Sequence, residues 1–283
     1  MRVATVDGLV TLFYDGSKPL FNWELEEEWW EEFSLWCNGW DYDEVRDEHW
    51  EDWDLSEECK KYWKDRRSWQ QIIVVEGVTA IPGFTFRKCN NIKRVIMADT
   101  VVRIEWGAFG SCSSLGYIKF STHLEYIERR AFIQCNLSSV FVPPTCRAIR
   151  ESAFTGNENL TIFNVPHDTV LGQDVISQTK LLRDSHFEVD KYGNYRDQTQ
   201  VHNWLKNMNN DNKYSLHRAC TSFQPLKEVL LTIVQAKGIG AFKVKNEAGV
   251  TPARYLKENP YADVDEMEIT RDYIATMMGE YNN

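Results

Sequence analysis

The chain has 283 residues, of which 43% are hydrophobic, so it is long enough for two or three domains with apolar cores. No run of residues approaches the roughly 18 consecutive apolar residues that a membrane-spanning helix needs, so no contact with a membrane is expected. The formal net charge is −10, and residues 24–58 hold 16 acids against the single base Arg46. Because phosphates repel acidic protein, this charge disfavours nucleic acid as a partner.

The N-terminal sequence and the seven cysteines both favour a cytoplasmic protein. The first residues, MRVATVDGLVTLFYDG, lack the basic start, the apolar core and the small-residue cleavage site of a signal peptide. An odd number of cysteines fits a reducing compartment in which thiols stay free. No Cys-x-x-Cys pair occurs, so the commonest zinc signature is missing. We therefore expect the protein in the cytoplasm or the nucleus.

Residues 1–68 are expected to form an N-terminal cap. Two β-rich runs, 3–6 and 9–14, flank Asp7-Gly8, a dipeptide typical of a hairpin turn. The stretch that follows is acidic and rich in tryptophan. Apolar residues at helical spacing predict a helix over 25–36, and Ser56 suits the N-cap of a second helix. We expect the tryptophans to pack against the open end of a repeat array, with a partner-binding surface as the alternative.

One sequence pattern recurs four times after this cap. Phe86, Phe109, Phe132 and Phe154 mark the copies and lie 23, 23 and 22 residues apart. Such a period is typical of a solenoid, in which stacked repeats bury a core that no single repeat could bury alone. A strand of the type Leu-x-x-Ile-x-Phe precedes the first copy and follows each of the four copies. Five such strands start at Trp69, Ile92, Leu115, Leu137 and Leu160.

The repeats resemble the BspA-like leucine-rich-repeat family in the pattern Ile-x-x-x-Ala-Phe-x-x-Cys-x-x-Leu-x-x-Ile. The second and third copies show it most fully, whereas Thr85 replaces alanine in the first copy and Asn157 replaces cysteine in the fourth. The resemblance covers residues 69–172 and implies a short parallel β-solenoid used for contacts with proteins. Cysteines that recur at the repeat period are interpreted as buried, inert ladder residues and not as nucleophiles.

Residues 187–283 are expected to be helical and to cap the C-terminal end. Helices are predicted over 198–208, from Pro225 onward and over 265–278. The segment 215–220, Ser-Leu-His-Arg-Ala-Cys, is similar to the start of an ankyrin repeat, and 249–252, Gly-Val-Thr-Pro, is similar to a second start. This resemblance implies a degenerate ankyrin-like segment at 214–258, in which His217 would orient a turn through a hydrogen bond.

The predicted fold class is therefore an α+β repeat protein. A short leucine-rich-repeat β-solenoid, residues 69–186, would lie between helical caps formed by residues 1–68 and 187–283.

The candidate binding surface is the concave face of this solenoid, because the variable positions of each strand point away from the core. Apolar and aromatic residues there are predicted to form an exposed stripe with cations beside it. The predicted ligand-binding residues are Ile73, Lys93, Arg94, Ile96, Tyr117, Lys119, Phe141 and Ile162. The alternative is that the N- or C-terminal region covers this face.

The sequence gives no sign of an enzyme. The six histidines are scattered without a His-Glu-x-x-His motif, and Cys37, His49 and Cys59 are interpreted as structural and surface residues instead of metal ligands. No cofactor is implied. We predict a non-catalytic protein–protein interaction module with a protein partner. The alternatives are a substrate-recognition adaptor of a multi-subunit enzyme and a surface adhesin, the role of many members of the family that the repeats resemble.

Overall fold

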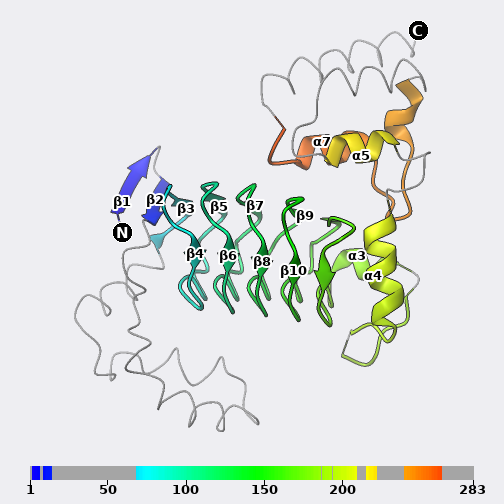
Figure 1. The fold of residues 1–283 in the computed structure, drawn as a ribbon, viewed down its shortest axis with the longest axis horizontal. Helices are drawn as coiled ribbons and strands as arrows, with labels where there is room; N and C mark the ends of the chain where they lie inside the picture. Colours follow the sequence, from blue (N-terminus) through cyan, green and yellow to red (C-terminus); the bar gives the residue numbers. More distant parts are fainter. Residues whose placement is uncertain are drawn as a thin grey trace.

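The computed structural model describes residues 2–6, 9–14, 68–185, 187–192, 194–208, 215–221 and 239–262. The helices predicted over 25–36, from Ser56, from Pro225 and over 265–278 lie outside these residues. The described repeats stack side by side into a parallel β-solenoid, as predicted (Figure 1).

Each turn of the solenoid contributes one strand to each of two stacks. The first stack consists of β3 (Gln71–Val74), β5 (Arg94–Met97), β7 (Tyr117–Lys119), β9 (Ser139–Phe141) and β11 (Ile162–Asn164). The second consists of β4 (Ala80–Ile81), β6 (Arg103–Ile104), β8 (Tyr126–Ile127), β10 (Ala148–Ile149) and β12 (Val170–Leu171). The second stack is one continuous parallel sheet, whereas the first divides between β7 and β9. The two-residue strands of the second stack were not predicted.

The N-terminal hairpin extends the first stack. β1 (Arg2–Val6) and β2 (Leu9–Tyr14) pair in antiparallel register around Asp7 and Gly8, which confirms the predicted hairpin. β2 then pairs in parallel with β3, so that Thr11 lies opposite Gln71. The first solenoid strand therefore has a strand partner at its N-terminal edge. In the described residues this edge is covered by a strand and not by a helix.

Aromatic rings from successive turns stack through the centre of the solenoid. The centroids of Phe86, Phe109, Phe132 and Phe154 are 5.2, 5.2 and 5.3 Å apart in sequence order, with the rings within 18° of parallel. All four side chains are fully buried. Stacked aromatic pairs add stabilisation beyond the burial of their area, so each turn is stabilised by its neighbours on both sides.

Sharp corners require a left-handed backbone at two positions in every turn. The pairs are Phe84 and Lys88, Gly107 and Ser111, Arg130 and Gln134, Ser152 and Gly156, and Asp174 and Gln178, with φ between 50° and 76°. Most of these residues are not glycine, although side chains disfavour this conformation. The corners are held because their backbone N–H groups bond to the next turn, as from Lys88 to the Gly110 carbonyl at 2.8 Å.

Short helices close the C-terminal end. α3 (Lys180–Arg183) follows the fifth turn, and α4 (Gln198–Asn207) confirms the helix predicted over 198–208. Val201 and Leu205 of α4 are buried in the same apolar cluster as the phenylalanine ladder. The Tyr195 hydroxyl accepts a hydrogen bond from the Val175 N–H at 3.0 Å. A backbone donor at the end of the stack is thereby paired with a side chain. α4 therefore packs against the core at the C-terminal end of the solenoid.

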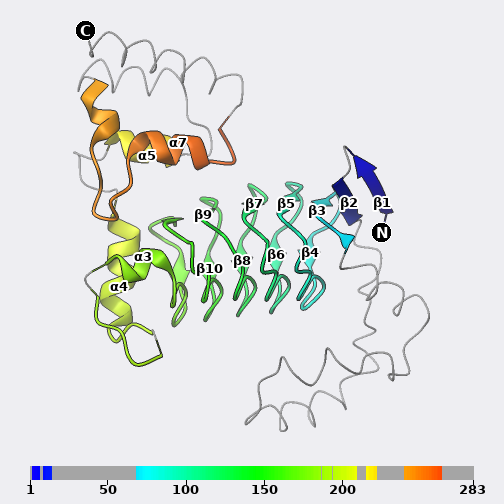
Figure 2. The ribbon, with the colours of Figure 1, turned by 180° about the vertical axis from the view of Figure 1, so that it is seen from behind.

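The chain then turns back toward the first stack. In Figures 1 and 2, α5 (Ser215–Thr221) and α7 (Pro252–Glu258) lie above the first stack, over β9 and the turns that follow it. The 3₁₀ helix η5 (Ile239–Lys243) precedes α7. Residues 215–221 and 239–262 are called the C-terminal module below.

We expect Asn157→Ala to lower the free energy of unfolding by about 3 kcal/mol, because it removes three buried hydrogen bonds. Asn157 is fully buried where the second and third copies have cysteine. Its Nδ2 donates to the carbonyls of Phe132 and Phe154, at 2.8 and 2.9 Å, and its Oδ1 accepts from the Leu137 N–H at 3.1 Å. Urea unfolding followed by circular dichroism measures the change.

The matched control is Asn157→Cys, because the thiols of Cys112 and Cys135 already donate to the equivalent carbonyls of Phe86 and Phe109. This variant should lose less stability than Asn157→Ala. Equal stability of Asn157→Ala and the unmodified protein would show that the amide does not stabilise the turn.

Candidate functional site

The candidate site is the outward side of the first stack, the concave face. Residues alternate along each strand, so that Ile72 and Val74 of β3 point into the core while Gln71 and Ile73 point outward. The register joins these outward residues into rows across the strands. Ile73 lies opposite Ile96, which lies opposite Lys119. The predicted alternation between core and variable positions is confirmed.

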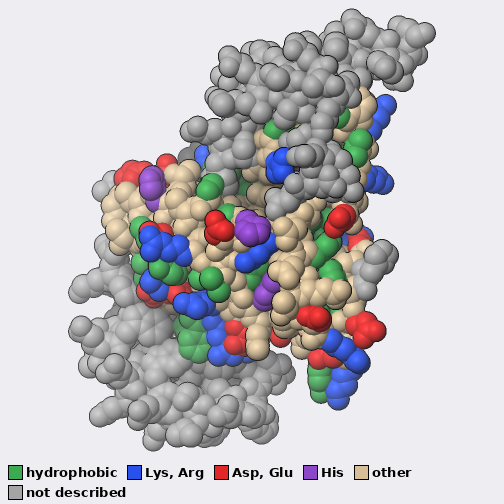
Figure 3. Space-filling view, turned by 45° about the vertical axis from the view of Figure 1, so that its right-hand side comes forward, with side chains coloured by type: hydrophobic (Ala, Val, Ile, Leu, Met, Phe, Trp, Pro, Cys, Tyr) green, Lys and Arg blue, Asp and Glu red, His purple; other side chains and the backbone are tan. Residues whose placement is uncertain are grey.

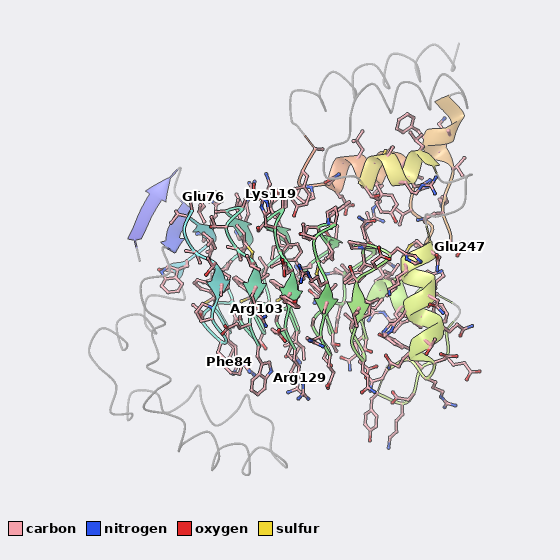
Figure 4. All side chains as sticks on the ribbon, viewed as in Figure 1. Glu76, Phe84, Arg103, Lys119, Arg129 and Glu247 are labelled. Atoms are coloured by element: carbon pink, nitrogen blue, oxygen red, sulfur yellow. The ribbon has the colours of Figure 1, made fainter. Side chains whose placement is uncertain are left out.

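The half of this face formed by β3, β5 and β7 remains accessible. Lys93 and Arg94 are exposed, and Ile73, Ile96, Tyr117 and Lys119 are half-buried. The Arg94 guanidinium lies over the Tyr117 ring, 4.6 Å from its centroid. Figure 4 shows Lys119 at the upper edge of the turns, toward the C-terminal module. Six of the eight predicted site residues thus lie together on this accessible half.

The other two predicted site residues, Phe141 and Ile162, are not exposed, so this part of the prediction is wrong. Both are only 1% accessible. They belong to a second apolar cluster with residues of the C-terminal module: Leu216, Cys220, Phe242, Val250, Tyr255 and Leu256. The alternative that a terminal region covers the face therefore holds for β9 and β11. Strand periodicity could not reveal this, because it separates core from variable positions but says nothing of a distant segment.

Specific contacts fix the C-terminal module over these strands. The rings of Phe141 and Tyr255 meet edge to face with centroids 6.3 Å apart. The Arg254 guanidinium donates to the Thr161 hydroxyl at 2.6 Å. The Asn164 side-chain amide lies 3.5 Å from the Thr221 carbonyl and donates to it. Apolar burial and polar contacts together make this an ordered intramolecular interface.

Tyr261 forms the boundary between the covered and accessible halves. Its hydroxyl donates to the Phe120 carbonyl at 2.9 Å, and its ring lies 5.7 Å from the Lys119 ammonium. Burial raises the pKa of Tyr261 well above its usual value, so the phenol stays neutral and keeps its donor proton. No local pattern in the sequence points to Tyr261, whose position depends on a contact between residues 141 apart in the chain.

The second stack has a different electrostatic character. Its outward arginines pair with carboxylates of neighbouring turns: Arg103 with Glu128 at 2.7 Å, Arg129 with Glu151 at 3.1 Å, Arg147 with Glu125 at 3.3 Å and Arg150 with Glu128 at 3.9 Å. In the view from the C-terminal side, basic and acidic side chains are intermixed over the surface (Figure 3). The charges of the second stack are thus largely compensated within the solenoid.

The described residues offer no obvious reactive or metal-binding group. They contain no cluster of three histidine, cysteine or acidic side chains that could hold a metal ion. All five cysteines in the described part of the chain are free and buried, and burial raises the pKa of the Cys146 thiol to about 12. Cys37, His49 and Cys59 lie outside the described residues. No helix within the described ranges is long and apolar enough to cross a membrane.

Comparison with known proteins identifies the repeat type. Residues 67–193 match the family described as a BspA type leucine rich repeat region, in six copies, two more than the four aligned from the sequence. No curated protein is significantly similar to this chain.

Several solved structures of leucine-rich-repeat proteins are similar to the chain. A leucine rich cell surface protein from Faecalibacterium prausnitzii is 32% identical over 35% of this chain and 26% of its own, with a TM-score of 0.34. A T. pallidum leucine rich repeat protein is 23% identical over 36% and 51%, with a TM-score of 0.35. One from Bacteroides ovatus is 19% identical over 40% and 42%, with a TM-score of 0.30. The matches span about a quarter to a half of the length of these proteins.

We expect Phe141→Ala to lower the free energy of unfolding by about 3 kcal/mol, because a fully buried ring would leave a cavity between solenoid and C-terminal module. Ile73→Ala, at an outward position of β3 in the accessible half, should cost about 1 kcal/mol. Thermal and urea unfolding measure both changes. A loss no greater for Phe141→Ala than for Ile73→Ala would mean that the module does not cover β9 in solution.

Proposed function

We propose that this chain, whose residues 67–193 form a BspA-type leucine-rich-repeat region, is a non-catalytic protein-interaction module. The observation that carries the proposal is the accessible half of the concave face. Ile73, Ile96 and Tyr117 are held outward on a closely packed solenoid, next to the exposed cations Lys93 and Arg94. A rigid face that presents apolar and charged side chains together is suited to binding protein, because little order is lost on association.

The size of this face suits a short segment of a partner. Strands in a sheet lie about 4.8 Å apart, so β3, β5 and β7 together span on the order of 10 Å from the first strand axis to the last. The C-terminal module, through Tyr261, limits the face on the β7 side. Such an area supports a peptide or one helix, at the low end of the range of specific interfaces.

We further propose that residues 214–258 are an ankyrin-like segment that completes the module. Its support is a set of local contacts. The Nε2 of buried His217 lies 3.0 Å from the Val250 carbonyl, and burial lowers the pKa of this imidazole, so it stays neutral. Thr251 caps the start of α7, with Pro252 in its first turn, and the Asn246 carboxamide accepts from the Val250 N–H at 3.0 Å.

The test of the binding face is affinity capture from native lysate with the full chain. We expect Ile73→Glu/Ile96→Glu to retain a specific partner at least about tenfold more weakly, since two apolar contacts are replaced by charges. Val170→Glu is the matched control, because Val170 is a 60% exposed apolar residue on β12 of the second stack. Circular dichroism must first show that all three proteins are folded at the temperature of the assay.

A partner lost only by Ile73→Glu/Ile96→Glu supports the proposal. A partner lost equally by Val170→Glu, or retained by both variants, contradicts it and moves the binding surface elsewhere. If the captured protein is a subunit of an enzyme complex, the chain acts as its recognition adaptor.

We also propose an intracellular location, supported by the free state of the described cysteines. After extraction of the native protein in the presence of an alkylating reagent, all seven cysteines should be modified as free thiols once the chain is denatured. Mass spectrometry counts the modified residues. Any disulfide in the native protein would contradict this location and favour the surface adhesin.

A further inference from the structure

We propose that the partner of the binding face proposed above, on which this inference rests, is an acidic protein segment with carboxylates next to an apolar side chain. The proposal is based on the positive charge of the accessible half. Lys93, Arg94 and Lys119 are the charged residues at the variable positions of β3, β5 and β7, and none of these positions is acidic.

These three cations lack the carboxylate partners found elsewhere on the solenoid. Within the described ranges, none of them forms an ion pair, whereas the second-stack arginines Arg103 and Arg129 both do. The pKa of the Asp99 carboxyl is lowered, mainly by a hydrogen bond from the Thr122 N–H and least by Lys119. One face of the solenoid therefore compensates its charges internally, and the other leaves positive charge available to a partner.

Aromatic rings hold two of these cations in place without neutralising them. The guanidinium of Arg94 lies over the Tyr117 ring at 4.6 Å, and the ammonium of Lys119 lies 5.7 Å from the Tyr261 ring. A cation on a ring keeps its full charge but loses part of its conformational freedom before the partner arrives. Because a carboxylate binds such a preorganised cation at a smaller entropic cost, these two cation–ring contacts favour the recognition of an anion.

The arrangement of the cations specifies the spacing of the partner's side chains. Arg94 and Ile96 are successive outward residues of β5, and Ile96 lies opposite Lys119 of β7. An apolar side chain seated on Ile73 and Ile96 would therefore have Lys119 next to it in the same row and Arg94 next to it in the neighbouring row. A segment that alternates acidic and apolar residues places a carboxylate next to each apolar side chain and so suits this arrangement.

A nucleic acid is the competing anionic ligand. The face offers three cations, and the chain as a whole carries a net charge of −10, which repels a long phosphate backbone. A peptide brings only a few charges and also fills the apolar positions between them. The observations therefore favour the acidic protein segment.

The experiment is fluorescence polarisation with a short labelled peptide of alternating Asp and Phe, titrated with the full chain. Arg94→Gln/Lys119→Gln should bind this peptide at least about tenfold more weakly, because a charge-assisted contact with a carboxylate is lost at each position. The matched control is Arg129→Gln/Arg150→Gln, which changes the net charge equally at exposed residues of the second stack. Figure 4 shows Arg129 and Lys119 at opposite edges of the turns.

Three outcomes would support the proposal together: loss of binding in Arg94→Gln/Lys119→Gln, full binding in the control, and no binding of the peptide with Lys in place of Asp. Binding should also weaken between about 0.1 M and 1 M salt, as the Debye length shortens from about 10 to 3 Å. No binding of the acidic peptide by the unmodified chain, or tighter binding of single-stranded oligothymidine, would overturn it.

Failure of this inference can be separated from failure of the proposed function. If the partner captured from lysate is lost by Ile73→Glu/Ile96→Glu but retained by Arg94→Gln/Lys119→Gln, the face binds protein through its apolar residues and the acidic chemistry is wrong. If neither variant loses the partner, the binding face itself is wrong.

Discussion

The stacking of like side chains between successive turns is the interaction on which the rest of the structure depends. Each phenylalanine of the ladder contacts its equivalents about one turn away, so no turn has a complete core of its own. The corners follow from the same constraint. Residues such as Arg130 and Ser152 adopt a left-handed backbone because their N–H groups then reach the carbonyls of the next turn.

The first and last turns of the solenoid each need an element that covers their exposed side, and the two ends use different elements. At the N-terminal end β2 supplies a further parallel strand to β3, and at the C-terminal end α4 places Val201 and Leu205 on the last turn. The C-terminal module then covers an apolar part of the concave face through Phe141 and Ile162. The solenoid thus uses part of its own concave face to hold a second unit, and what remains is the half formed by β3, β5 and β7.

The two stacks of strands also differ in how their charged side chains are compensated. On the second stack, cross-turn pairs such as Arg103 with Glu128 connect neighbouring repeats. Exposed pairs of this kind add little stability each, but they leave little uncompensated charge for a partner. On the accessible half of the first stack, Arg94 and Lys119 rest on aromatic rings and keep their charge available. This difference supports placing the proposed binding function on one side of the solenoid.

The sequence by itself determined the repeat, the strands of its first stack and the identity of the core ladders, because these depend on local periodicity that recurs every turn. It also determined the hairpin at Asp7-Gly8 through the turn preference of that dipeptide. The sequence also indicated that Asn157 departs from the pattern, although the three hydrogen bonds that its amide makes were visible only in three dimensions. Only the tertiary structure decided that Phe141 and Ile162 are covered while Ile73 and Ile96 are not. The physical reason is that periodicity reports which side of a strand faces the core, whereas the covering contacts join residues far apart in the chain, as Tyr261 does with Phe120.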